Sequence, residues 1–264
     1  MKIIVATDFS ENAQKALDFT LVNFNEKGTE YVLLHASYIR QAGETLTVDL
    51  DEEASSKTAV KLRQYCEEIK ERYPDIWITS MTKAGNLANV LVHTVEEENA
   101  DMVVMGTNGV TGLYEKMIGS NTEEVMNVLE CPLMVVPFSS EVKKIDTMEV
   151  AIEKVQRDLK AIEFSARLGK SIGANVHLLH LFGPDEDPEN FDIPSNLFEG
   201  SHLAIVQIQT SSPDLEKVIH QFSEKDAADL IVVIPHHRSF LKGLFHRSVT
   251  ENLLKTTRIP LLII

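Results

Sequence analysis

The sequence predicts an α/β protein made of two tandem doubly wound parallel-sheet domains, the second a degenerate copy of the first. Short apolar runs alternate with amphipathic stretches, which is typical of strands joined by helices that cover both faces of a parallel sheet. The pattern then restarts at a constant offset of 145 residues. The echoed segments are Ala6-Thr7-Asp8 with Ala151-Ile152-Glu153, Lys15–Thr20 with Lys160–Ser165, and Leu33-Leu34-His35 with Leu178-Leu179-His180. One register held over three elements indicates an internal repeat.

The first half, residues 1–138, is expected to hold five strands and four helices. Strands are expected at Lys2–Thr7, Tyr31–His35, Ile76–Thr82, Met102–Met105 and Leu133–Val136. Ser10 is a plausible N-cap for a first helix that runs to about Asn23. Residues 41–56 are polar and acidic, so a loop is expected before a long helix that ends near Arg72. Further helices are expected around Leu87–Val95 and from Ser120.

A polar linker at residues 139–147 is expected to lead into a second domain at residues 148–264. Strands are expected at Leu203–Ile208, Leu230–Ile234 and Pro260–Ile264, with helices at Leu215–Lys225 and from Ser248. Residues 183–202 contain three prolines and show no helical period, so the long helix of the first half is expected to have no counterpart there.

Composition narrows the classes of partner. The formal net charge of −15 disfavours binding to nucleic acid and to anionic membranes. The two cysteines, Cys66 and Cys131, have no metal-binding spacing and suggest a reducing compartment. No apolar run approaches the roughly 18 residues of a membrane span, and no signal-peptide pattern opens the chain. A cytoplasmic protein is therefore expected.

A glycine-containing stretch follows the fourth strand of the first half. Gly106 and Gly109 are separated by nine residues from Gly119-Ser120, where a helix is expected to begin. Glycines permit close backbone approach to an anion, and helix-start N–H groups point at it, so the stretch predicts a phosphate cradle. A plainer interpretation is that Ser120 and Glu123 form a helix-capping box and that the glycines serve ordinary turns.

The second half provides an internal comparison. Ser248–Glu251 repeats the capping box, but Pro235, Arg238 and Arg247 stand where the first half has its glycines, in a loop one residue shorter. Because the second half makes the helix start without glycines, we interpret those of the first half as kept for phosphate contact. The second half is then expected not to bind nucleotide in the same way.

The spacing of these glycines resembles the nucleotide motif of the universal stress protein family. The opening strand ending in Asp8 and the segment Leu33-Leu34-His35-Ala36 are also similar to that family. The resemblance implies five-stranded, adenine-nucleotide-binding domains and ATP as ligand, with or without Mg²⁺. It implies that Asp8 and the backbone of Ala36 hold adenine and ribose, and that the phosphates are lined by Gly106, Gly109, Gly119, Ser120 and Asn121. It further implies an intramolecular pseudo-dimer of the two domains, with further homo-oligomerisation left open.

The expected function is an ATP-binding regulatory protein of the stress response, with the nucleotide held by the first domain only. The alternatives are a structural interaction module without nucleotide and a slow ATP hydrolase. No catalytic residues are expected, because no Ser/His/Asp spacing is present and no second acid pairs with Asp8. In the second half, Glu153, His180, His236 and His237 fall at strand ends and are weak candidates for metal ligands. No metal site is expected there, because the same side chains are explained equally well as solvated or core-edge residues that fill a disused nucleotide pocket.

Overall fold

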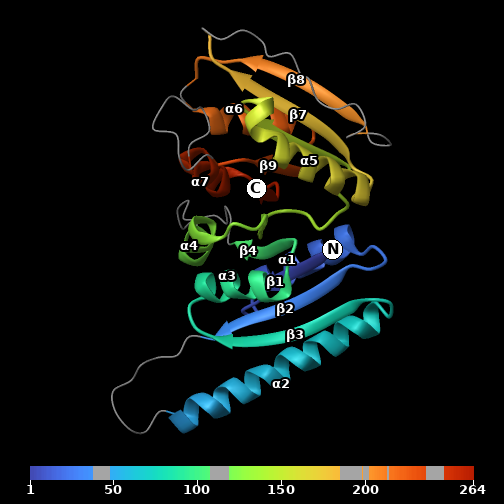
Figure 1. Cartoon of the computed structure of the whole chain (residues 1–264), viewed down its shortest axis with the longest axis vertical. Helices are drawn as coiled ribbons and strands as arrows, with labels where there is room; N and C mark the ends of the chain where they lie inside the picture. The colour runs from blue at the N-terminus through green and yellow to red at the C-terminus, as the bar shows by residue number, and fades with distance from the viewer. Residues whose placement is uncertain (38–47, 108–118, 185–197, 199–201, 213, 236–246) are drawn as a thin grey trace. The chain divides into compact units, whose positions relative to one another are not determined.

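A computed structural model of the chain describes residues 1–37, 48–107, 119–184, 198, 202–212, 214–235 and 247–264. The described residues divide into two compact units. The first contains Met1–Thr107 and Gly119–Met134, and the second runs from Val135 to Ile264. Each unit is a parallel sheet with helices on its faces (Figure 1), so the expected fold class is confirmed.

The first unit alternates strands and helices in the expected order. Its elements are β1 (Lys2–Ala6), α1 (Glu11–Phe24), β2 (Glu30–Ser37), α2 (Val48–Arg72), β3 (Trp77–Ala84), α3 (Leu87–Glu98), β4 (Met102–Thr107), α4 (Ser120–Val128) and β5 (Leu133–Pro137), which crosses the division. The loop expected through residue 56 is wrong, since α2 already begins at Val48. The acidic first turns of α2 lack the apolar period that marks a helix in the sequence.

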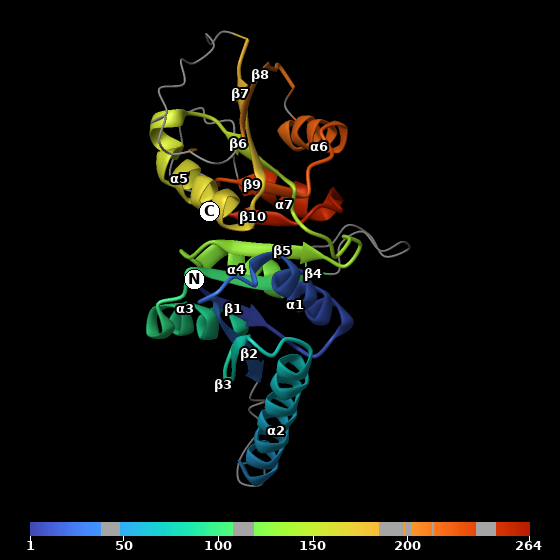
Figure 2. The same cartoon turned by 90° about the vertical axis from the view of Figure 1, so that its right-hand side faces the viewer.

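The strand order of the first unit reverses next to β1. β1 pairs in parallel with β2 on one side and with β4 on the other, and β2 pairs with β3. β5 lies next to β4. α1 and α2 cover one face of this sheet and α3 covers the other (Figure 2). The carboxyl ends of β1 and β4 therefore flank a topological switch point, the place where open α/β sheets bind ligands.

The second unit repeats this arrangement with the strand order β10-β9-β6-β7-β8. Its elements are β6 (Thr147–Ile152), α5 (Val155–Ile172), β7 (Asn175–Phe182), β8 (Leu203–Gln209), α6 (Leu215–Lys225), β9 (Leu230–Val233), α7 (Arg247–Thr256) and β10 (Leu261–Ile263). α5 covers one face of the sheet, and α6 and α7 cover the other (Figure 2). The expectation that no helix stands between β7 and β8 concerns residues that lie mainly outside the described part of the chain.

The repeat extends to single hydrogen bonds. The amide of Lys2 donates to Asp101 Oδ2 at 2.7 Å, and the amide of Thr147 donates to Asp229 Oδ2 at 3.0 Å. Asp101 thus anchors the start of β1 to the turn before β4, and Asp229 anchors the start of β6 to the turn before β9. An amide donor held by a carboxylate is among the stronger protein hydrogen bonds, so both units keep the same anchor.

The strand register corrects the alignment of the two glycine-loop regions. Ile3 pairs with Met102 in the first unit, and Met148 pairs with Leu230 in the second, so the strand before each loop is offset by 128 residues. Ser120 and Ser248 differ by the same 128 positions. The loops therefore have equal length, and Gly106 corresponds to Ile234 rather than to Pro235. The sequence comparison introduced a one-residue gap that the pairing of β9 with β6 does not allow.

Candidate functional site

The loop between β1 and α1 places a carboxylate at the switch point. Asp8 is exposed, and its Oδ1 accepts a hydrogen bond from the amide of Ser10 at 2.9 Å. Ser10 is the N-cap of α1, as expected, because its Oγ accepts from the amide of Ala13 at 3.3 Å. Since Ser10 caps the helix, Asp8 is not needed for that role, and its side chain faces solvent.

Phe9, the residue between them, has a left-handed backbone. Its φ is 62°, which is costly for a bulky side chain because Cβ crowds the carbonyl. Three contacts hold it there. Its amide donates to Thr7 Oγ1 at 3.1 Å, its ring lies 5.1 Å from the ring of His35, and Lys61 Nζ lies 4.1 Å from its ring centroid. Backbone strain of this kind is common at ligand-binding sites.

The end of β2 supplies the next part of the site. His35 Nδ1 lies 2.8 Å from the carbonyl oxygen of Thr7, and because a carbonyl only accepts, Nδ1 carries the proton. This bond ties the end of β2 to the end of β1. Ala36 follows in β2, partly exposed, and pairs with Lys83 of β3. The site residues expected from the sequence did not include His35, although it stands in the quoted Leu-Leu-His-Ala segment.

Gly106 lies near the end of β4 and has a structural reason to be glycine. A Cβ there would lie 2.7 Å from the carbonyl carbon of Asn12, and closer still to its oxygen. Atoms cannot approach that closely, so the first turn of α1 can pack on β4 only over a glycine. The interpretation of Gly106 as kept for phosphate contact is therefore not required by this structure.

Gly119 differs from Gly106 in this respect. Among the described residues, a Cβ at Gly119 would meet only Thr122 Oγ1, at an ordinary 3.8 Å, and its φ of −57° suits any residue. No contact among the described residues requires a glycine at this position. Gly119 opens α4, where the backbone N–H groups of the first turn have no partner within the helix.

The cap of α4 corrects one expectation. Gly119, not Ser120, is the N-cap, and no described side chain caps the helix, so the expected capping box with Ser120 as N-cap does not form. Ser120 and Asn121 are exposed in the first turn. In the second unit, α7 already includes Arg247 and Ser248, so Ser248 is not the N-cap either. An uncapped helix start with exposed side chains offers its amides and the positive end of its dipole to an anion.

The remaining expected residue, Gly109, lies outside the described part of the chain. Of the others, Asp8 and Ala36 lie at the carboxyl ends of the neighbouring strands β1 and β2. Gly106 lies near the carboxyl end of β4, next to β1 on its other side, and Gly119–Asn121 open the helix that follows β4. The first unit thus gathers an exposed carboxylate and an uncapped helix start around one switch point.

The corresponding loop of the second unit is closed by internal contacts. Glu153 stands where the first unit has Asp8, but it is buried, and its Oε2 accepts from Arg157 Nη2 at 2.5 Å. Asp158 Oδ2 accepts from the amides of Glu153 and Lys154 at 3.0 and 3.1 Å. The carboxylate that could meet a ligand is therefore neutralised by the chain itself.

The same contacts bear on the weak metal candidates. His180 is buried, and its Nε2 lies 2.9 Å from the carbonyl oxygen of Glu153. His236 and His237 lie outside the described residues. Within the part of the chain that the structure describes, no three His, Cys, Asp or Glu side chains are grouped as metal ligands would be.

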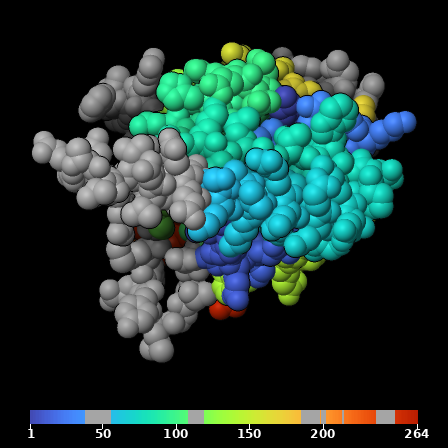
Figure 3. Space-filling model, turned by 90° about the horizontal axis from the view of Figure 1, so that it is seen from below, coloured from blue at the N-terminus to red at the C-terminus, as the bar shows by residue number. Residues whose placement is uncertain are grey.

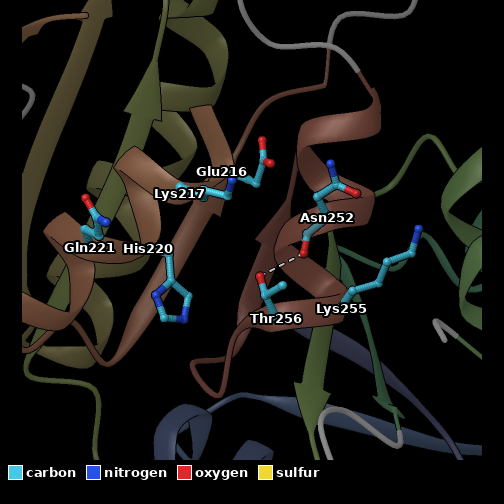
Figure 4. A pocket seen from close by; sticks show the side chains of 7 residues that line it. All are labelled: Glu216, Lys217, His220, Gln221, Asn252, Lys255 and Thr256. Atoms are coloured by element: carbon cyan, nitrogen blue, oxygen red, sulfur yellow. Dashed lines mark hydrogen bonds between the residues drawn. The ribbon is translucent and has the colours of Figure 1, made fainter. Parts of the chain in front are cut away.

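Recesses open on the helical layers of the described residues, and two of them bear on the candidate site and its counterpart. One, of about 380 Å³, lies between the start of α1 and α2 and is bordered by Phe9, Ser10 and Lys61. The other, of about 400 Å³, lies between α6 and α7 of the second unit, with His220 on one helix and Asn252, Lys255 and Thr256 on the other (Figure 4). The first adjoins the candidate site, whereas the second lies on the helical layer of the other unit.

Comparisons with known proteins agree with this arrangement. The model of the universal stress protein family matches residues 1–137 and 199–264. The universal stress protein MJ0577 of Methanocaldococcus jannaschii is 29% identical over 151 residues, which cover 51% of this chain and 93% of that protein. YxiE, a universal stress protein of Bacillus subtilis, is 25% identical over 147 residues, covering 51% of this chain and 97% of its own.

Solved structures extend the likeness over both units. The crystal structure of a universal stress protein from Archaeoglobus fulgidus is 19% identical, covers 99% of this chain and 97% of that chain, and has a TM-score of 0.73. A universal stress family protein from Arabidopsis thaliana, solved with AMP bound, is 19% identical with a TM-score of 0.39 and covers 52% of this chain and 91% of that chain. The Archaeoglobus likeness supports the tandem fold.

Proposed function

The chain belongs to the universal stress protein family, and we propose that its first unit binds one adenine nucleotide, ATP, in a regulatory role in the stress response. Adenine and ribose would lie against Asp8 and the backbone of Ala36. The phosphates would lie at the start of α4, on Gly119, Ser120 and Asn121, with Gly109 in the preceding loop.

The observation that carries this proposal is the start of α4. No described residue fills the space at Gly119 and its backbone is unstrained, yet it is glycine at the start of α4 beside the switch point. A phosphate resting on the first-turn amides needs that empty space. Gly106, which α1 requires for its packing, would contribute to the site only through its backbone.

Two differences support binding by the first unit only. At the position of Gly119 the second unit has Arg247, so it lacks the glycine that would leave the backbone open to a phosphate. At the position of Asp8 it has Glu153, which Arg157 already binds. A nucleotide would have to displace Arg157 from Glu153, so we propose that the second unit has lost the site.

We propose a binding role and not catalysis. Proteins of this family are generally not classical enzymes, and the sequence offers no second acid to pair with Asp8 for acid–base work. None of the described helices has the length and apolar character to cross a bilayer. The two isolated thiols, Cys66 and Cys131, favour a cytoplasmic location.

Isothermal titration calorimetry tests the proposal. ATP, titrated with and without Mg²⁺, should bind at one molecule per chain. Gly119→Asn is the sharpest variant, because asparagine caps helices at least as well as glycine while its side chain fills the phosphate space. Binding should fall at least tenfold in Gly119→Asn with the melting temperature unchanged, and Gly119→Val should abolish it. Arg247→Ala serves as the control and should bind as the parent does.

The outcomes separate the alternatives. Two equivalent sites, or undiminished binding by both Gly119 variants, would refute the one-site proposal. No binding of ATP or AMP at millimolar concentration would favour the structural interaction module. Steady release of phosphate, absent from the Gly119→Val protein, would instead indicate a slow hydrolase.

We further propose that the two units pair as an intramolecular pseudo-dimer. The resemblance to the family motivates this, because single-domain relatives commonly pair through the last strand, here β5 and β10. Small-angle X-ray scattering should give a radius of gyration of about 18 Å, the value for one compact particle of this chain length. A clearly larger radius, with a distance distribution of two peaks, would show two separated units and refute the pairing.

A further inference from the structure

We propose that Lys61 of α2 is a positioning residue for nucleotide binding, acting through Phe9 to hold the β1–α1 loop in its ligand-binding shape. The inference rests on the proposed nucleotide site. It assigns to α2, which supplies none of the expected site residues, a part in setting the affinity of that site.

The starting point is the strained residue. A non-glycine residue at φ 62° persists only where its surroundings hold it, and Phe9 separates Asp8 from the capping residue Ser10. If Phe9 relaxed to an extended backbone, the turn closed by the Asp8–Ser10 hydrogen bond would open and the carboxylate would move. The position of Asp8 therefore depends on what holds Phe9.

Lys61 is the contact that comes from outside the sheet. Its Nζ lies 4.1 Å from the centroid of the Phe9 ring, well within the range of a cation–π interaction. His35 contacts the same ring at 5.1 Å and is itself bonded to Thr7, so β1, β2 and α2 meet on one side chain. Lys61 is exposed and α2 lies at the surface of the first unit (Figure 3), so the contact can break and re-form.

The recess beside this pair makes such movement feasible. It holds about 380 Å³ between the start of α1 and α2, and Lys61 stands on its border with Phe9 and Ser10. The ammonium can therefore leave the ring for solvent without displacing a buried side chain. The Phe9 contact is then a reversible support, not a fixed part of the core.

The corresponding loop of the second unit, between β6 and α5, is held without a contact like that of Lys61 with Phe9. Lys154 stands at the position of Phe9 and has an extended backbone, with φ −144°. Asp158 bonds its amide from within α5, and Arg157 binds Glu153. That loop is held by its own helix, whereas the loop of the first unit relies on residues of β2 and α2.

The test compares Lys61→Met, Lys61→Arg and Lys70→Met. Methionine keeps the apolar stem and removes the charge, arginine restores the cation–π contact, and Lys70 lies on the same helix in an exposed pair with Glu67. Calorimetry should show ATP binding weakened roughly two- to fivefold in Lys61→Met, the effect of an exposed cation–π contact, and restored in Lys61→Arg. Lys70→Met should bind as the parent does.

A second readout needs no nucleotide. Amide exchange at Phe9 and Ser10 should be faster in nucleotide-free Lys61→Met than in the parent, and normal in Lys61→Arg. In Phe9→Leu, which has no ring, adding Lys61→Met should change neither exchange nor affinity further.

The outcomes are distinct. Unchanged exchange and unchanged ATP affinity in Lys61→Met would overturn the inference while leaving the nucleotide site in place. If the parent binds no ATP but exchange is still faster in Lys61→Met, the proposed function is refuted, whereas the conclusion that Lys61 supports the β1–α1 loop stands. Equal weakening by Lys61→Met in the Phe9→Leu background would show that Lys61 acts on the ligand directly, and would also overturn it.

Discussion

At the residue scale, Gly106 and Gly119, which lie on either side of residues 108–118, are glycines for different physical reasons. Gly106 is glycine because the backbone of Asn12 lies against it, a contact between segments far apart in the sequence. No local pattern reveals such a contact, and so the sequence comparison grouped it with Gly119. That no described residue needs a glycine at position 119 likewise appears only when the neighbours are placed in three dimensions.

This difference predicts opposite effects of adding side chains. Gly106→Ala should destabilise the first unit by about 1–3 kcal/mol, because α1 must move off β4 to admit the methyl group. Gly119→Asn should change the free energy of unfolding by less than about 0.5 kcal/mol. Urea denaturation followed by circular dichroism measures both. Equal costs at the two positions would contradict the assignment of Gly106 to packing and Gly119 to the ligand.

A second residue-scale prediction concerns the end of α6. Ala227 has φ 52°, and in the repeat it corresponds to Asn99, which has φ 49° at the end of α3. Asparagine and glycine tolerate this left-handed position, whereas alanine is destabilised because its Cβ lies too close to the following carbonyl oxygen. Ala227→Gly should therefore raise the free energy of unfolding by about 0.5–1 kcal/mol, after allowing for the greater chain entropy of glycine. The matched change Asn99→Ala should lower it, and thermal melts compare the two.

At the element scale, periodicity and repetition predicted nearly every strand and helix. The starts of helices were harder. Ser10 caps α1 as expected, but the same reasoning failed at Ser120, where the helix begins on Gly119 without a side-chain cap. A serine three residues before a glutamate is compatible with either position, and only the backbone of the preceding loop decides between them. The start of α2 was missed because its first turns carry no apolar stripe.

β6 contains a buried acid that the first unit lacks. Glu149 is fully buried in the position that Ile4 holds in β1, and its Oε1 accepts from Ser223 Oγ at 2.8 Å. Among the described residues nothing bonds to Oε2. His177 of the neighbouring β7 pairs with Asp226, the residue that follows α6, and Asp226 adds a negative charge near Glu149. Burial, with this charge, raises the pKa of Glu149 to about 8.

The raised pKa predicts that the second unit loses stability as the pH rises. Between the ordinary pKa of 4.5 and about 8, the folded chain keeps a proton that the unfolded chain releases. The free energy of unfolding should therefore fall with pH across this window, by at most about 1.4 kcal/mol per pH unit. Glu149→Gln carries no titrating group and should flatten that slope. Denaturation at pH 5 and pH 8 checks it, and an equal slope in both proteins would show that Glu149 does not titrate there.

At the scale of the whole molecule, the two units share a register, an aspartate anchor and a strand order, and they differ at the carboxyl ends of their strands. The first unit keeps an exposed carboxylate and a helix start at which no described residue fills the space beside Gly119, while the second binds its own carboxylate with Arg157. The fold class and the repeat follow from sequence pattern alone. The asymmetry was predicted from the glycines, but its physical basis also includes the local pair of Glu153 with Arg157 and the tertiary contacts of Phe9.

The asymmetry predicts that ligand stabilises one unit and not the other. A ligand that binds only the folded state adds about 2.7 kcal/mol at a concentration one hundredfold above its dissociation constant. With ATP in that excess, amide exchange should slow in β1, β4 and α4 by the corresponding factor of about one hundred, wherever exchange requires unfolding of the first unit. The counterparts β6, β9 and α7 serve as the control within the same molecule and should exchange at their ligand-free rates. Equal protection of both sets would mean either a second nucleotide site or unfolding of the chain as a single unit, and the calorimetric stoichiometry distinguishes these two cases.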